Sequence, residues 1–189
     1  MVILGIVIGG VLAVITTFIL IAVEVNAIHT TVNGWRSTMK CGIPGNGILL
    51  RAACAAVLPA ANLPKEAMYW TTTKDNKGQK LNNQHDYILR FPAGQLPPND
   101  AFWSVTVTDL QNSMVYNPIN RYSVCDRSGL VPNADGSIDI YIQSTAPAGH
   151  ESNWLPAPAG NFKLWLRVYL PGVAILEGKY KVPPVVEVK

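Results

Sequence analysis

The first candidate for chemistry is the segment His150-Glu151-Ser152, which places three residue types of hydrolytic active sites side by side. A serine nucleophile needs a base within hydrogen-bond distance, and that base needs an orienting carboxylate. Adjacent residues of one loop rarely meet in this geometry, and the chain contains no G-x-S-x-G elbow to expose a serine. We therefore predict no catalytic residues from this segment.

Metal-binding patterns are equally weak. The segment from Asn133 to Ser137 superficially fits a calcium loop, but it lacks the alternating carboxylates and the terminal glutamate. Its Asp-Gly pair before an alternating strand is typical of a turn. The histidines and cysteines share no ligand spacing, so we predict no metal and no cofactor. These residues are His29, His85, His150, Cys41, Cys54 and Cys125.

The three cysteines have two interpretations. We favour buried or inert thiols, because free cysteine packs as a small apolar residue. In an oxidising compartment, a Cys41–Cys54 disulfide would form instead and leave Cys125 free.

Two polar and aromatic stretches, residues 117–127 and 151–158, contain the residue types that build binding patches. The competing interpretation, which we favour, is structural: the polar groups bond to loop backbone, and Arg121 pairs with Asp126. The candidate ligand-binding or partner-binding residues are Asn120, Arg121, Tyr122, Asp126, Arg127, Asn153 and Trp154.

The charge pattern argues against nucleic acid as a partner. The net charge is +3, only 14% of the residues are charged, and the basic residues are scattered from Arg36 to Lys189. Binding along a phosphate backbone needs a clustered basic face. Without its apolar N-terminus the chain keeps roughly 150 residues, enough for one core that buries about two-thirds of the unfolded surface.

The N-terminus predicts a transmembrane helix. A helix from Ile3 to Val23 would be about 31 Å long, which matches a hydrocarbon core of about 30 Å. Lipid forces the helical form, since every backbone group must be paired internally. The alternative is a cleaved signal peptide, with Val25-Asn26-Ala27 as a small-x-small site, but the apolar stretch is too long and no basic residue precedes it.

The orientation and association of this helix stay open. The nearest basic residues, Arg36 and Lys40, follow the span, so a literal positive-inside count places the domain in the cytoplasm. Both residues lie too far from the span for that count to be strong. Gly5 and Gly9 form G-x-x-x-G, which could bring two helices together in a weak homodimer.

The elements that position the candidate residues are mostly β-strands. Alternating segments predict strands at 67–73, 87–91, 102–108, 138–143 and 162–170, with turn residues between them. The Ala-rich and Leu-rich segment 48–57 predicts one short helix, ended by Pro59. We therefore predict an anchor at 1–25, a juxtamembrane linker at 26–45 and a β-sandwich domain at 46–189.

Several motifs together resemble domain-of-unknown-function family 1214, especially its short membrane-anchored members. The likeness extends over nearly everything after the anchor, and it departs at Cys125, where glycine is expected. The motifs are Ala101–Asp109, Asn117–Ser123, Asp135–Ser137, Ser152–Pro158 and Leu166–Tyr169, with Asn33–Trp35, Arg51-Ala52 and Glu66–Tyr69 upstream.

The resemblance implies a bacterial, jelly-roll-like antiparallel β-sandwich without assigned catalytic residues. It also implies frequent association with domain-of-unknown-function family 1254, which a partner protein would supply here. The anchored members resemble exported envelope proteins, which favours the periplasmic side. We expect a non-catalytic domain that binds a protein partner or glycan through the loops of Arg121, Tyr122 and Trp154. The alternative is a hydrolase of envelope material that uses Asp126, Arg127 or His150.

Overall fold

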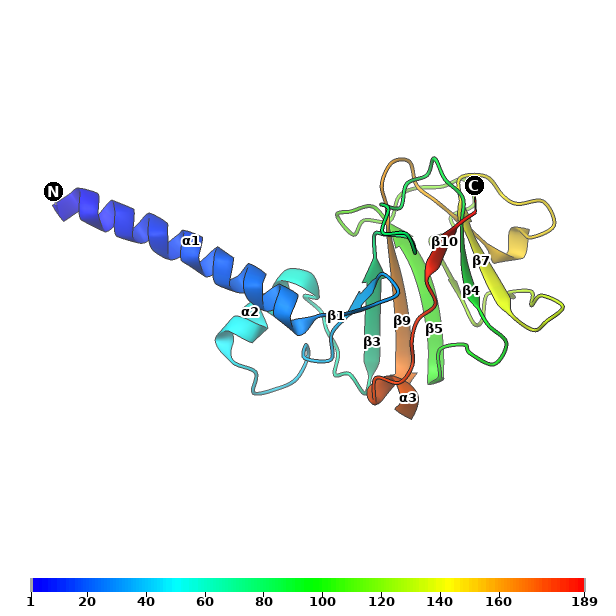
Figure 1. Ribbon diagram of the computed structural model, residues 1–189, viewed down its shortest axis with the longest axis horizontal. Helices are drawn as coiled ribbons and strands as arrows, with labels where there is room; N and C mark the ends of the chain where they lie inside the picture. Colours follow the sequence, from blue (N-terminus) through cyan, green and yellow to red (C-terminus); the bar gives the residue numbers. More distant parts are fainter. Residues whose placement is uncertain (1, 189) are drawn as a thin grey trace. The chain divides into compact units, whose positions relative to one another are not determined.

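A computed structural model describes residues 2–188 of the chain (Figure 1). These residues form two compact units. The first, residues 2–29 and 38–64, is helical; the second, residues 30–37 and 65–188, is mainly β.

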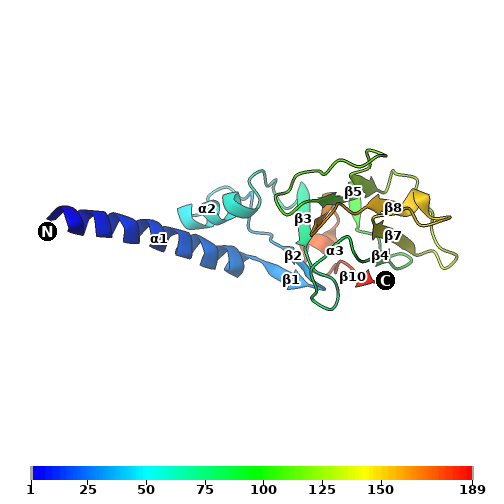
Figure 2. The ribbon, with the colours of Figure 1, turned by 90° about the horizontal axis from the view of Figure 1, so that it is seen from above.

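The β unit contains two sheets that pack around one core. The larger sheet has the strand order β1-β2-β3-β9-β5-β6, and the smaller has the order β10-β4-β7-β8. Figure 2 shows β2 and β3 on one side of this unit and β7 and β8 on the other. The strands of the larger sheet are β1 (Thr30–Val32), β2 (Trp35–Ser37), β3 (Ala67–Thr72), β5 (Asn99–Thr108), β6 (Ser123–Cys125) and β9 (Lys163–Pro171). Those of the smaller sheet are β4 (Tyr87–Phe91), β7 (Ile138–Gln143), β8 (Trp154–Pro156) and β10 (Val185–Glu187).

Alternation along the strands explains how the sheets pack. In β9, Leu164, Leu166 and Val168 are fully buried in the core, whereas the residues between them lie on the other face of the sheet. The cross-strand partners follow the same rule, since Val105 of β5 lies opposite Leu166. Aromatic rings join the two sheets: Phe91 of β4 and Trp103 of β5 lie 5.3 Å apart between ring centroids.

The helical unit consists of α1 (Val2–Ile28) and α2 (Ile48–Val57). Helix α1 is long and apolar enough to cross a membrane, and the same length and composition also fit a signal sequence. Helix α2 has the predicted bounds, and it ends where the Leu58 N–H bonds to the Cys54 carbonyl just before Pro59.

A disulfide joins Cys41 to Cys54, with Cα atoms 5.5 Å apart, and Cys125 is free. Our preference for inert thiols was therefore wrong for the first two cysteines. Cys125 lies in β6 with a negative φ, so this position does not need the glycine that the family pattern suggests.

Other predictions need correction. The expected linker at 26–45 contains the end of α1 and a β1–β2 hairpin, whose turn places Asn33 and Gly34 at positive φ. The sandwich is not wholly antiparallel, because β8 pairs with β7 in parallel. The alternation along residues 162–170 predicted that the Leu170 side chain lies on the core face. Leu170 instead has φ +48° and is exposed. A short helix, α3 (Val173–Leu176), and a 3-10 turn, η1 (Glu151–Asn153), add to the predicted helix.

Candidate functional site

Arg121 joins the two loops that the sequence singled out. Its Nη1 atom donates to the backbone carbonyls of Glu151 at 2.7 Å and Trp154 at 3.0 Å. Hydrogen bonds from a charged donor are stronger than neutral ones. The guanidinium therefore holds the loop that precedes β6 against the segment that forms η1 and β8.

The loop before β6 is shaped by its own amides. The Asn117 side chain donates to the Arg121 carbonyl and accepts from the Arg121 N–H, both at 3.0 Å. Asn120 adopts φ +50°, and its side chain accepts a 3.3 Å hydrogen bond from the Tyr122 hydroxyl. Asparagine tolerates this left-handed conformation better than most residues. These polar groups are used to fold the loop.

Asn153 and Trp154 have the same kind of role. Asn153 is 3% exposed; its side chain accepts from the Val131 N–H and donates to the carbonyls of Val131 and Asp139. The Trp154 indole donates to the Gln143 carbonyl at 2.9 Å. The buried amide thus fixes β8 beside β7, and the indole stays half-buried at the surface.

Asp126 and Arg127 lie at the other end of β6. Arg127 donates to the Ala101 carbonyl at 2.7 Å and lies over the Phe102 ring, which stacks on Tyr169 with centroids 4.4 Å apart. Within residues 2–188 no ion pair joins Arg121 to Asp126, so that predicted pair was wrong. Arg121 bonds to two carbonyls instead.

The residues of the alternative enzyme hypothesis do not form a catalytic arrangement in the described part of the chain. His150 packs on the Tyr141 ring with centroids 4.8 Å apart, and no hydrogen bond or ion pair joins it to Asp126 or Arg127. Glu151 accepts a hydrogen bond from the Gly149 N–H. Bonds from backbone N–H groups hold the pKa of Glu151 below its ordinary value. The residues 133–137 form a turn, closed by the Asn133 N–H on the Ser137 carbonyl. No three potential metal ligands cluster among the described residues.

A groove of about 300 Å³ lies between the two joined loops. We call it the loop groove, and its walls are residues 115–119, Trp154 and residues 156–159, with Val107 and Ser144. Among the described residues that line it, none is charged. Its most prominent apolar groups are Val115, Tyr116, Pro118, Ile119, Trp154 and Pro156.

The apolar part of this groove was not predicted from the sequence. Tyr116 is 76% exposed, and Met114, Val115 and Ile119 are exposed near it. A run of large apolar residues in a segment that forms no strand was the available signal, because such residues are normally buried. Apart from Trp154, the residues that line the groove are neighbours of the candidate residues named from the sequence.

A second, polar pocket of about 530 Å³ lies beside β10 and was not predicted. Glu187 accepts from Lys77 at 3.1 Å and pairs with His85 at 2.8 Å. The Lys77 hydrogen bond is the main reason that the pKa of Glu187 is lowered. Burial raises the pKa of Tyr87, whose hydroxyl accepts from the Asn82 N–H. The acid is thus already neutralised by its neighbours.

Comparisons with known proteins give a family but no activity. The model of the family "Protein of unknown function (DUF1214)" matches residues 66–173. None of the curated proteins matches the chain. Among solved structures, the chain is similar to the VPA0106 protein from Vibrio parahaemolyticus, with 32% identity over 77% of this chain and a TM-score of 0.65. It also shares its fold with an uncharacterised protein from Burkholderia cenocepacia, with 18% identity over 74% of this chain and a TM-score of 0.51.

The match covers 36% of the Vibrio chain and 33% of the Burkholderia chain, so this chain spans about a third of the length of both. The family match extends from the residue before β3 to the first residue of α3, and it includes both walls of the loop groove. The chain belongs to domain-of-unknown-function family 1214.

Proposed function

We propose that this protein is a membrane-anchored envelope protein whose β-sandwich binds a protein partner through the loop groove. One observation carries the proposal: the loops use their polar side chains to hold themselves together and leave an uncharged, apolar and aromatic surface exposed. Exposed apolar patches on a folded domain mark interaction surfaces.

A protein fits this groove better than a glycan does. A sugar is recognised by several convergent polar side chains. Here the Arg121 backbone occupies the Asn117 amide and the Gln143 carbonyl occupies the Trp154 indole N–H, so the remaining polar side-chain groups of the walls are the hydroxyls of Ser144 and Tyr116. Tyrosine and tryptophan beside proline provide the rigid apolar contacts typical of protein interfaces.

The partner that we propose is a protein of domain-of-unknown-function family 1254. We retain a hydrolase of envelope material as the alternative function.

A retained α1 is supported by its packing. Val25 and Ile28 pack with Ala53 and Cys54, and Ile28 is 4% exposed. Cleavage after Ala27 would remove Val25 from this small core, which favours an anchor over a cleaved signal peptide. A G-x-x-x-G dimer of α1 through Gly5 and Gly9 stays a proposal.

The disulfide supports the periplasmic side. Disulfides persist in oxidising compartments and are rare in the cytosol. This outweighs the positive-inside count, since Arg36 and Lys40 lie well beyond the span.

We also propose a jelly-roll-like strand order. It is supported by the passage of the chain from one sheet to the other between β3 and β4, β4 and β5, β6 and β7, β8 and β9, and β9 and β10.

Photo-crosslinking tests the groove directly. Benzoylphenylalanine replaces Tyr116 in the groove or, as a control, Val173 of α3, which is 68% exposed. We expect one defined protein adduct at position 116 in cells and none of that mass at position 173. In the position 116 strain, Ile119→Asp should remove the adduct, whereas Leu96→Asp, at an exposed apolar position outside the groove, should not.

Two results would overturn the proposal. Equal adducts at both positions would show that the groove is not selective. A glycan adduct, or none, at position 116 would exclude a protein as its partner.

A further inference from the structure

Helix α1 changes character near residue 21. Residues 2–20 are exposed on every side of the helix. From Ile21 onward, one stripe becomes covered, formed by Ile21, Glu24, Val25 and Ile28. The spacing of three and four residues places these side chains on one face. About 20 residues cross a hydrocarbon core, so the covered stripe begins where a span from Ile3 would end.

Helix α2 provides this cover. Leu50, Ala53 and Cys54 form a small core with Val25 and Ile28, and the disulfide from Cys54 to Cys41 ties the preceding loop to it. Gly42 in that loop approaches the Asn62 backbone so closely that a side chain would collide with it. The segment 38–64 is therefore fixed beside the last turns of α1.

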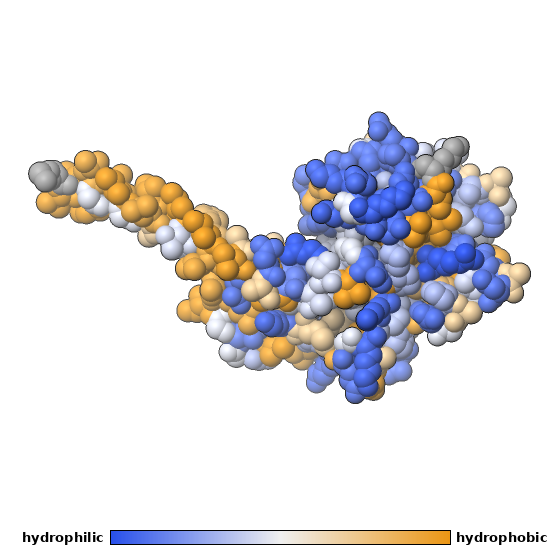
Figure 3. Space-filling model, viewed as in Figure 1, coloured by the Kyte–Doolittle hydropathy of each residue, from blue (hydrophilic) through white to orange (hydrophobic). Residues whose placement is uncertain are grey.

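The outer surface of this segment is unusually apolar. Ile48, at the start of α2, is 87% exposed, and Met39, Ile43 and Leu49 are exposed as well. Lys40 and Arg51 are the charged residues of segment 38–64, which contains no acidic residue. Figure 3 shows apolar residues covering the visible face of α1, with more of them beside its C-terminal end.

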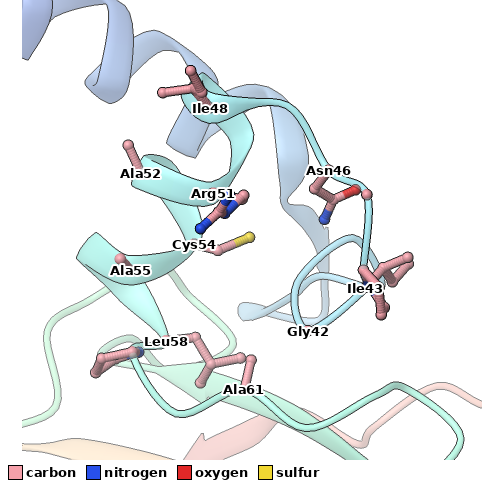
Figure 4. Close-up of a pocket in the computed structure, with 13 residues that line it drawn as sticks. Gly42, Ile43, Asn46, Ile48, Arg51, Ala52, Cys54, Ala55, Leu58 and Ala61 are labelled. Carbon is pink, nitrogen blue, oxygen red and sulfur yellow. The ribbon is translucent and has the colours of Figure 1, made fainter.

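A pocket of about 760 Å³ opens in this surface. Figure 4 shows Ile48 at one end of the pocket and Leu58 and Ala61 at the other. Across the pocket, Arg51 and Cys54 of α2 face the loop that carries Ile43. Among residues 2–188, no acid pairs with the Arg51 guanidinium.

We propose that this pocket binds a membrane phospholipid, with an acyl chain against Ile43, Ile48 and Leu58 and the headgroup phosphate on Arg51. The inference rests on the proposed function in one respect, namely that α1 is inserted in a membrane. Segment 38–64 then lies at the depth of the headgroups, where apolar side chains reach the acyl chains and basic side chains meet anionic lipids.

Two features favour lipid over a protein or a second copy of the chain. The apolar surface is continuous with α1 through the Val25 and Ile28 contacts, so a bilayer around α1 reaches it directly. Its two charges are both positive, which complements phosphate. An arginine beside an apolar pocket matches the two ends of a phospholipid.

The test uses the full chain in vesicles of phosphatidylethanolamine and phosphatidylglycerol. Benzoylphenylalanine replaces Ile48, Phe18 in the middle of α1, or Val173 in the β unit, and lipid adducts are measured by intact mass. We expect strong lipid adducts at positions 18 and 48 and none at 173. With the probe at 48, Arg51→Gln should reduce the preference for phosphatidylglycerol over phosphatidylethanolamine several-fold, and Lys65→Gln, a cation outside this segment, should not.

The outcomes separate the two proposals. Adducts at 18 but only background at 48, or protein adducts at 48, would overturn the lipid site and leave the anchor intact. Background at 18 would mean that α1 is not inserted and would overturn the anchor as well. An unchanged lipid preference in Arg51→Gln, with the disulfide intact by mass, would contradict the phosphate contact.

Discussion

Replacing Arg121 by methionine should destabilise the β unit, because the Arg121 guanidinium holds the loop before β6 to the segment that forms η1 and β8. Methionine keeps much of the side-chain volume and removes the donors to the Glu151 and Trp154 carbonyls. Each hydrogen bond from a charged donor contributes about 1.5–3 kcal/mol. The Glu151 position is exposed, so water can replace part of that loss. We expect a net loss of about 3 kcal/mol in the free energy of unfolding.

Tryptophan fluorescence in urea measures this change. All five tryptophans lie in the β unit, so the signal reports its unfolding in detergent without contribution from α1 or α2. With a slope of about 2 kcal/mol per molar urea, the midpoint should fall by about 1.5 M. Arg127→Met is the matched control, since Arg127 donates to one carbonyl and is exposed. It should lower the stability by about 1 kcal/mol.

A small effect would refute this role of Arg121. If Arg121→Met lowers the midpoint no more than Arg127→Met does, the carbonyl contacts do not hold the loops. If it also abolishes the adduct at Tyr116 in a fully folded protein, Arg121 contacts the partner directly.

Three further predictions follow from buried or paired groups. Asn153→Ala removes three hydrogen bonds to backbone groups, of which the one to the Asp139 carbonyl is buried, and should lower the urea midpoint at least as much as Arg121→Met; an unchanged midpoint would contradict this. Cys54→Ala opens the link to Cys41, 13 residues away, and should destabilise the helical unit by about 3 kcal/mol, seen as faster proteolysis of segment 38–64 with unchanged tryptophan fluorescence. The pKa of Glu187 is lowered in the folded state by Lys77, so its contribution is complete above its ordinary value of 4.5 and is lost as the pH falls through the lowered value. The stability difference between the wild type and Glu187→Gln should therefore shrink in acid, and a difference that does not change with pH would contradict the pairing.

The long strands were predictable because one face of each is buried. Alternation located β4 and β7 with their observed bounds, and composition with flanking proline did the same for α2. The family resemblance, carried by motifs such as Ala101–Asp109, was confirmed by the family match.

The short strands were not predictable from local pattern. Strands β1, β2, β6, β8 and β10 have three residues each, too few for alternation to be visible. Strand β10 exists because it pairs with β4, nearly a hundred residues earlier, and β8 pairs in parallel with β7. Asn33-Gly34 was a usable hairpin signal for β1 and β2, but it lies beside the anchor, where a linker was expected.

At the candidate site, residue type alone did not determine whether a polar side chain binds a partner or holds the fold together. Arg121, Asn153 and Trp154 were named as binding candidates, with a structural role as the favoured interpretation, and the fold uses their polar atoms to bond backbone. Whether these residues also bind a ligand stays a prediction. Tyr116 and Ile119 could be recognised as an exposed surface only once the segment between β5 and β6 was known to form no strand.

Both the anchor and the lipid site require that α1 remains attached to the folded chain at a membrane. The direct measurement is the intact mass of the untagged protein from salt-washed and carbonate-washed membranes. We predict that it stays in the membrane fraction with a mass that includes residues 2–28. A soluble protein that begins at Ile28 would contradict the account, because neither the anchor nor the lipid site beside it could then exist.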